Sequence, residues 1–120
     1  MANRAGESVG AYGERVAVRY LLDQGMQILD RNWRCRHGEI DVVARDGETL
    51  VFCEVKTRRT PRCGTPLESV VRAKVRRLRR LAAQWMVTTG QHAEKVRFDV
   101  IGVFPQKVGP ARLQHVREAF

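Results

Sequence analysis

The sequence has no long hydrophobic run and few cysteines. No apolar stretch approaches the ~18 to 20 residues of a membrane-spanning helix, and the N-terminal MANRAGESVG lacks the apolar centre of a secretory signal. The three cysteines include no CxxC pair, so they indicate neither a disulfide framework nor a zinc site. We therefore expect a cytoplasmic protein that does not associate with membranes.

Prolines are also few, and no repeat or low-complexity segment is present. With 4 prolines, 43% hydrophobic residues and 29% charged residues, the 120-residue chain has the composition of a folded protein. Most domains contain roughly 100 to 150 residues. We expect residues 1–120 to form a single domain.

Negative charge is scarce relative to positive charge. The chain has 22 Lys and Arg against 13 Asp and Glu, which gives a net charge of +9. Such an excess suits a polyanion, because each phosphate that a basic side chain neutralises releases condensed counterions. Nucleic acid is the first candidate partner, although a basic protein without such a ligand would have the same composition.

Hydrophobic periodicity predicts two helices and five strands. Helices are expected at 7–24 and 66–88, the second with a capping box that starts at Thr65 and an end near Gly90. Strands are expected at 26–35, 40–44, 49–55, 96–104 and 112–116. The order α-β-β-β-α-β-β predicts an α/β fold in which helices cover a central mixed sheet.

The stretch GEIDVVARDGETLVFCEVKTR, residues 38–58, places charges inside two predicted strands. Asp46-Gly47 between two β-branched runs is a strong hairpin signal. With these two residues as the turn, Asp41 faces Phe52, and Asp41 and Glu54 are diagonal neighbours. A register shifted by two residues would set Asp41 directly opposite Glu54, whereas a shift by one would separate them.

In this register one face of the hairpin is charged and the other apolar. The apolar face, which we assign to the core, carries Ile40, Val42, Ala44, Val51, Cys53 and Val55, while Glu39, Asp41, Glu54 and Lys56 project from the charged face. A half-solvated sheet also has a polar face. It would carry mixed polar types, however, whereas this face gathers three acids that repel each other unless a cation is present. The cluster favours a divalent-cation site.

Two more charged residues lie on or beside apolar helix faces. Lys74 falls near the centre of the apolar stripe of the second helix, where a lysine either extends to solvent or reaches an acidic partner. Glu14 borders the apolar face of the first helix and is either a further acid of the site or an exposed glutamate. Arg76 falls on the outward side of the second helix.

An Asp, a hairpin and then Glu-x-Lys is the layout of the restriction-endonuclease-like, PD-(D/E)xK, nuclease fold, whose positions Asp41, Glu54 and Lys56 occupy. Along almost the whole chain the sequence also resembles the YraN-type family of small bacterial proteins, in GExxAxxYL, ILDRNWR, GEIDVVARD, LVFCEVKTR, GTPLESV and RFDVIGV. The resemblance implies a mixed sheet flanked by helices, similar to archaeal Holliday-junction resolvases. Ile40 replaces the proline of the motif's name, which is often absent in this superfamily.

The resemblance implies a metal-dependent endonuclease that hydrolyses phosphodiester bonds in DNA, with branched or structured DNA among the candidate substrates. Mg²⁺ or Mn²⁺ would be bound by Asp41, Glu54 and the backbone carbonyl of Val55. Glu14 or Glu39 would contribute directly or through water, and Glu14 is nominated because an acid from the first helix joins the site of the junction resolvases. Lys56 would position or help deprotonate the attacking water and stabilise charge on the phosphate.

Basic residues around the site would hold the nucleic-acid backbone without reading its sequence. They are Arg58, Arg59 and Arg62 in the loop after the hairpin, with Lys74 and Arg76 of the second helix. We expect DNA rather than RNA. Junction resolvases act as dimers, which leaves a homodimer open, although no apolar surface stripe identifies an interface. Two alternatives remain, a nucleic-acid-binding protein of the same fold without catalysis and a scaffold protein whose acid cluster is structural.

Overall fold

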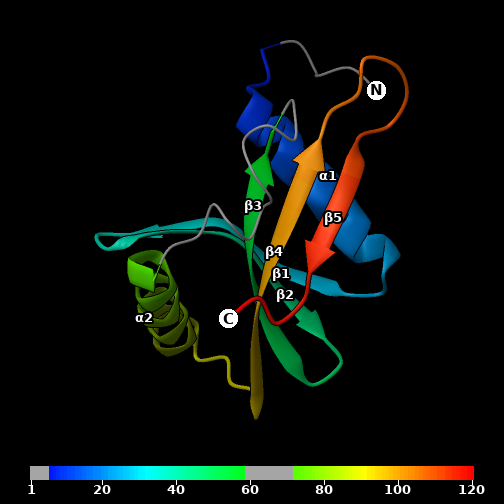
Figure 1. Ribbon diagram of the computed structural model, residues 1–120. Coiled ribbons are helices and arrows are strands. Elements are labelled where there is room, and N and C mark those ends of the chain that lie inside the picture. Colours follow the sequence, from blue (N-terminus) through cyan, green and yellow to red (C-terminus); the bar gives the residue numbers. More distant parts are fainter. Residues whose placement is uncertain (1–5, 59–71) are drawn as a thin grey trace.

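The computed structural model describes residues 6–58 and 72–120, the second range with side chains from residue 74 onward. The elements are α1 (Val9–Asp23), β1 (Gln27–Cys35), β2 (Gly38–Asp46), β3 (Thr49–Thr57), α2 (Arg72–Thr89), β4 (Lys95–Phe104) and β5 (Arg112–Val116). The expected mixed α/β fold and its element order are confirmed (Figure 1). The capping box at Thr65 lies outside the described residues.

The described strands form one sheet in the order β1-β2-β3-β4-β5. The central pair, β3 and β4, is parallel, and the other neighbours are antiparallel. A parallel pair needs a crossover connection, which here contains α2. Neither α1 nor α2, over the residues described, has the length and apolar character that a membrane crossing requires.

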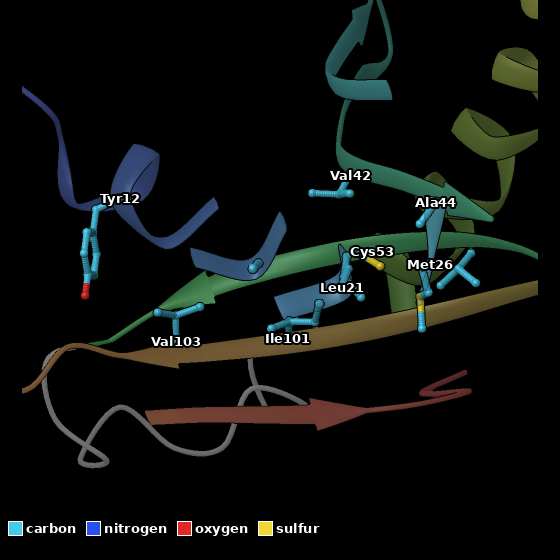
Figure 2. Close-up of a cluster of buried hydrophobic side chains, with 10 residues drawn as sticks. Tyr12, Leu21, Met26, Val42, Ala44, Cys53, Ile101 and Val103 are labelled. Atoms are coloured by element: carbon cyan, nitrogen blue, oxygen red, sulfur yellow. The ribbon is translucent and has the colours of Figure 1, made fainter. Parts of the chain in front are cut away.

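The two helices cover opposite faces of this sheet (Figure 1). Successive side chains of a strand point to opposite faces, so Val42 packs in the cluster under α1 and Val43 in the cluster under α2. On the α1 side, Leu21 and Met26 pack with Cys53 and strand residues of β4 (Figure 2). The core therefore has two layers, one on each side of the sheet.

Helix α2 packs through the apolar stripe that the sequence predicted. Leu78, Leu81, Ala82 and Trp85 are buried. The indole N–H of Trp85 donates a hydrogen bond of 2.9 Å to the carboxylate of Asp30 in β1, which satisfies the one polar atom of this buried side chain. This bond ties α2 to β1, the edge strand of the sheet.

The β2–β3 hairpin differs by two residues from the expected register. Its loop residues are Gly47 and Glu48, because Asp46 pairs with Thr49 and Val42 pairs with Cys53. Gly47 has φ +60, the left-handed conformation that glycine adopts most readily at the first central position of a two-residue hairpin turn. The prediction of Asp46-Gly47 as the turn was therefore wrong by one residue, which changes every cross-strand partner by two.

The assignment of Ile40 to the same apolar face as Val42 was also wrong. Ile40 packs with Val43 in the cluster under α2, whereas Val42 lies under α1. The β2–β3 pairing ends at Val42 and Cys53. Just beyond that pair, the carboxylate of Asp41 accepts the backbone N–H of Val55. The alternation of β2 is interrupted between Ile40 and Val42, where this side-chain contact takes the place of backbone pairing with β3.

Helix α1 approaches β3 closely at Gly13. A Cβ at this position would fall on Oγ1 of Thr57 and lie 2.9 Å from its Cβ. The two glycines of this helix thus differ, because a Cβ at Gly10 meets nothing within 4 Å. Gly13 is required for packing, and it sets the position of Glu14, the next residue of the helix.

We expect Gly13→Ala to lower the free energy of unfolding by roughly 1 to 3 kcal/mol, because the added methyl group overpacks the contact with Thr57. Gly10→Ala, the matched control on the same helix, should raise it by up to about 1 kcal/mol through helix propensity. Urea unfolding measures both. Adding Thr57→Ala to Gly13→Ala should restore part of the loss, and equal tolerance of the two alanines would contradict the close approach.

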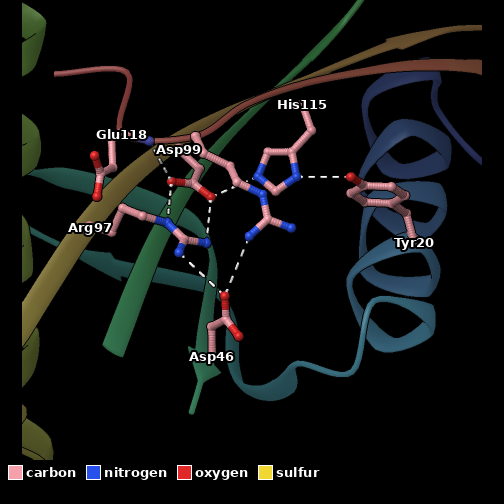
Figure 3. A network of polar contacts seen from close by, with 7 residues as sticks. Tyr20, Asp46, Arg97, Asp99, His115 and Glu118 are labelled. Atoms are coloured by element: carbon pink, nitrogen blue, oxygen red, sulfur yellow. Dashed lines mark hydrogen bonds and ion pairs between the residues drawn. The ribbon is translucent and has the colours of Figure 1, made fainter. Parts of the chain in front are cut away.

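A buried polar network joins the edge of the sheet to α1 and to the hairpin turn (Figure 3). Its centre is Asp99, fully buried in β4, which accepts hydrogen bonds from Arg97 at 2.9 and 3.1 Å and contacts Nε2 of His115 at 2.7 Å. His115 continues to the hydroxyl of Tyr20 in α1, and Arg97 to Asp46. Burial raises the pKa of Asp99, but its hydrogen bonds outweigh burial and leave the pKa below the ordinary value.

Asp99→Ala should lower the free energy of unfolding by about 3 kcal/mol or more, since it leaves Arg97 without its buried partner. Asp23→Ala is the control, because its ion pair with Arg19 is exposed and such pairs contribute about 0 to 1 kcal/mol. Denaturant titration of both variants distinguishes the two cases. A loss at Asp99 as small as that at Asp23 would contradict a stabilising network.

Candidate functional site

A cavity of about 420 Å³ lies among α1, β2, β3 and α2. All six residues predicted for catalysis or metal binding line it, namely Glu14, Glu39, Asp41, Glu54, Val55 and Lys56. The second helix contributes Lys74 to the opposite wall. Residues that are far apart in the sequence are therefore brought together at the hairpin, where the sequence predicted a cluster of charged side chains.

Asp41 is a buried carboxylate held by the backbone of the neighbouring strand. Its Oδ2 atom accepts the amide N–H of Val55 at 2.8 Å, and the residue is 9% exposed. Burial raises the pKa of Asp41 to about 7, and the negative charge of Glu54 adds to this effect, while the hydrogen bond from Val55 opposes it. Ionised Asp41 thus lies in a poorly solvated environment close to other carboxylates.

Glu54 is also buried, and two lysines share one of its oxygens. The ammonium of Lys56 lies 3.0 Å from Oε1, and that of Lys74 lies 2.7 Å from the same atom. Lys74 was expected either to extend to solvent or to reach an acidic partner, and in the structure it reaches Glu54. Burial and the neighbouring Lys74 lower the pKa of Lys56. Burial also opposes charge on Lys74, but the contact with Glu54 raises its pKa overall.

Glu14 reaches the cavity from α1. Burial raises the pKa of Glu14, and a hydrogen bond with the side chain of Asn32 opposes that rise. Asn32 itself has φ +51, a left-handed conformation that asparagine tolerates better than most residues. Of the two interpretations of Glu14, the structure places it at the site.

The donor set fits a hydrated divalent ion. Mg²⁺ prefers oxygen ligands, keeps several waters and is usually bound by one or two carboxylates. Asp41 and Glu54 supply two such carboxylates from adjacent strands. Across residues 6–58 and 72–120, no three His, Cys, Asp or Glu side chains are arranged to hold a metal ion by themselves. Asp41 and Glu54 could thus hold such an ion only with retained waters, and both lysine ammonium groups contact one oxygen of Glu54 in this structure.

The residues expected to bind nucleic acid are not gathered in the same way. Lys74 lines the cavity, whereas Arg76 is exposed on α2 and Arg58 follows the end of β3, where its guanidinium donates to the carbonyl of Thr57. Arg59 and Arg62 lie outside the described residues. The expected basic surface is thus described only in part.

Sequence reasoning missed two residues at the site. Arg77 lines the cavity, and its spacing of three residues from Lys74 on one helix could have revealed it. No sequence signal indicated Asn32, the partner of Glu14, because local periodicity does not show which residues of β1 and α1 meet in the fold.

Comparison with known proteins places the chain in a family. The model of uncharacterised protein family UPF0102 matches residues 13–103, a range that includes every residue lining the cavity. The chain belongs to this family. The YraN-type membership expected from the sequence is thereby confirmed at the level of the family.

Three relatives show how far the similarity extends. The UPF0102 protein of Kineococcus radiotolerans is 58% identical over 94% of this chain and 93% of its own. That of Beutenbergia cavernae is 54% identical over 95% and 97%, and that of Frankia alni is 53% identical over the full length of both. The family resemblance therefore covers nearly the whole chain.

The raised pKa of Asp41 predicts a pH-dependent stability in protein stripped of metal with EDTA. Because the folded pKa lies above the ordinary value of 3.8, ionised Asp41 opposes folding. This opposition is absent below the ordinary pKa, grows as the pH rises to about 7 and is constant above that pH. Asp41→Asn should therefore stabilise the protein at about pH 8, by at most about 4 kcal/mol, and much less at about pH 4.5.

Thermal unfolding at the two pH values measures this effect. Asp23→Asn, an exposed carboxylate at the end of α1, is the control and should show little difference between them. A stabilisation by Asp41→Asn that is equal at both pH values would contradict a raised pKa for Asp41.

Proposed function

We propose that this protein is a metal-dependent endonuclease that hydrolyses phosphodiester bonds in DNA, with branched or structured DNA among its candidate substrates. The proposal includes a likeness of fold to restriction-endonuclease-like nucleases and Holliday-junction resolvases. The observation that carries it is the cavity in which Asp41 and Glu54 meet the lysine two residues after the second acid. This arrangement combines carboxylates for a cation with an ammonium group for a phosphate.

Carboxylates would hold the ion. Asp41 and Glu54 would bind Mg²⁺ or Mn²⁺ with the carbonyl of Val55, and Glu14 or Glu39 would contribute directly or through water. A bound ion of this kind stabilises negative charge on a phosphate and lowers the pKa of a coordinated water. The hydrogen bond from Val55 keeps Asp41 aimed into the cavity, and Asn32 does the same for Glu14.

Lys56 would act on the attacking water and on the phosphate. Its ammonium lies beside Glu54, at the place where an ion held by Glu54 would meet substrate. The lowered pKa of Lys56 makes its neutral form easier to reach, which favours acceptance of a proton from water. In its charged form Lys56 would stabilise the negative charge that develops on phosphate oxygens.

Positive charge on α2 would hold the DNA backbone. Lys74 and Arg77 line the cavity, and Arg76, Arg79 and Arg80 are exposed along the same helix. Contacts of this kind give affinity and orientation without sequence readout. They also predict binding that weakens steeply as salt is raised.

A cleavage assay tests the proposal. The protein should cut at least one of labelled single-stranded, duplex and four-way branched DNA in Mg²⁺ or Mn²⁺ and none in EDTA. Asp41→Asn and Lys56→Ala should each reduce the rate by roughly a hundredfold or more, because each removes a group that acts on the ion or the phosphate. Glu48→Gln, in the exposed hairpin turn, should cut at the wild-type rate.

The same assay distinguishes the alternatives. Absence of cutting on every substrate, or cutting undiminished in both variants, would contradict the enzymatic proposal. DNA binding at low salt without cutting would favour a nucleic-acid-binding protein, and absence of binding at low salt would favour a scaffold.

A further inference from the structure

Two ammonium groups occupy the carboxylate that the proposed ion needs. Lys56 and Lys74 both contact Oε1 of Glu54, at 3.0 and 2.7 Å. All three side chains are largely buried, with 19% of Lys56, 27% of Lys74 and 9% of Glu54 exposed. In this state the negative charge of Glu54 is already balanced from within the protein.

A divalent ion on Glu54 would change that balance. It would bring two positive charges beside two ammonium groups in a poorly solvated cavity, where like charges repel more strongly than in water. An ion that coordinated Oε1 of Glu54 would also compete directly with both ammonium groups for that oxygen. This repulsion favours the departure of at least one lysine from Glu54 when an ion binds.

Lys74 is the lysine placed to leave. Lys56 lies two residues from Glu54 on the same strand, which pairs with β4 through Lys56 and Thr57, so its side chain starts beside Glu54. Lys74 reaches Glu54 across the cavity from α2 and is the more exposed of the two. Rotation of its flexible side chain is enough to move its ammonium away from Glu54 and toward the cavity mouth.

We propose that Lys74 is the internal cation of the metal-free protein. It holds Glu54 until a divalent ion replaces it, and the released ammonium then binds a backbone phosphate of the nucleic acid. This inference rests on the proposed function and adds a regulatory step to it. Metal binding to Glu54 releases Lys74 for the phosphate, and phosphate binding to Lys74 frees Glu54 for the metal. Metal and nucleic acid should therefore strengthen each other's binding.

Titration with Mn²⁺ tests the exchange on the full-length protein, stripped of metal and measured by the paramagnetic resonance of free Mn²⁺. Lys74→Met should bind Mn²⁺ on the order of tenfold more tightly than wild type, because the ion no longer competes with the ammonium. The control Arg19→Met removes one exposed charge from α1, outside the cavity lining, and should change the affinity by less than about twofold. Lys56→Met should gain less than Lys74→Met.

A second titration tests the released ammonium. Mn²⁺ should strengthen the binding of a phosphorothioate oligonucleotide, which resists hydrolysis, to the wild-type protein. In Lys74→Met this strengthening should fall by about threefold or more, because the phosphate loses a ligand. Arg19→Met should keep the full strengthening by Mn²⁺.

Three kinds of result would contradict this inference in whole or in part. Equal or weaker Mn²⁺ binding by Lys74→Met, or an equal gain in Lys56→Met or Arg19→Met, would overturn the exchange and leave the proposed nuclease function standing. An undiminished effect of Mn²⁺ on oligonucleotide binding in Lys74→Met would remove the phosphate-binding role. Absence of Mn²⁺ binding in both wild type and Lys74→Met would overturn the exchange and the metal-dependent function together.

Discussion

The hydrogen bond from the amide of Val55 to the carboxylate of Asp41 is the contact on which the site depends. Backbone pairing of β2 and β3 ends at Val42 and Cys53, and the next link between the two strands is this side chain. The strands can therefore separate without leaving the partly buried amide of Val55 unsatisfied. Beyond this point β3 continues its parallel pairing with β4, while the space beside β2 becomes the cavity.

The same arrangement makes the site unfavourable for folding and suited to chemistry. Four acids line one cavity whose wall also includes Leu78 and Leu81 of α2. Their mutual repulsion is offset by Lys56 and Lys74, which meet on a single oxygen of Glu54. Because an apolar core cluster packs on each face of the sheet, the charged cluster is not an ordinary solvated face. Such clusters of perturbed groups are typical of functional sites, where stability is lost for the sake of reactivity.

Local sequence patterns predicted most of the fold. The apolar spacing of both helices and the β-branched runs gave the element order, and the spacing around Lys74 gave its place on the inward face. The hairpin register could not be fixed in this way, because either Asp46-Gly47 or Gly47-Glu48 supplies a suitable turn. The position of Ile40 depended on where β2 leaves β3, and no local pattern encodes that point.

Partners that are distant in the sequence were harder to predict. Asn32 meets Glu14, and His115 meets Asp99, only after the sheet has formed. In the sequence, Asp99 is one polar residue within an apolar strand, and no local pattern indicates its polar network. Gly13 similarly gave a weak helix signal, although its small size is what lets α1 approach Thr57. Tertiary packing, in each case, decides what the residue does.

The occupancy of the cavity by a metal ion tests the central claim most directly. Anomalous diffraction from crystals grown with Mn²⁺ should give a peak in the cavity at about 2.0 to 2.3 Å from carboxylate oxygens of Asp41 and Glu54, with Lys74 displaced from Glu54. Crystals saturated with Mn²⁺ that have no peak there, and in which Lys74 still contacts Glu54, would contradict a metal-dependent nuclease site.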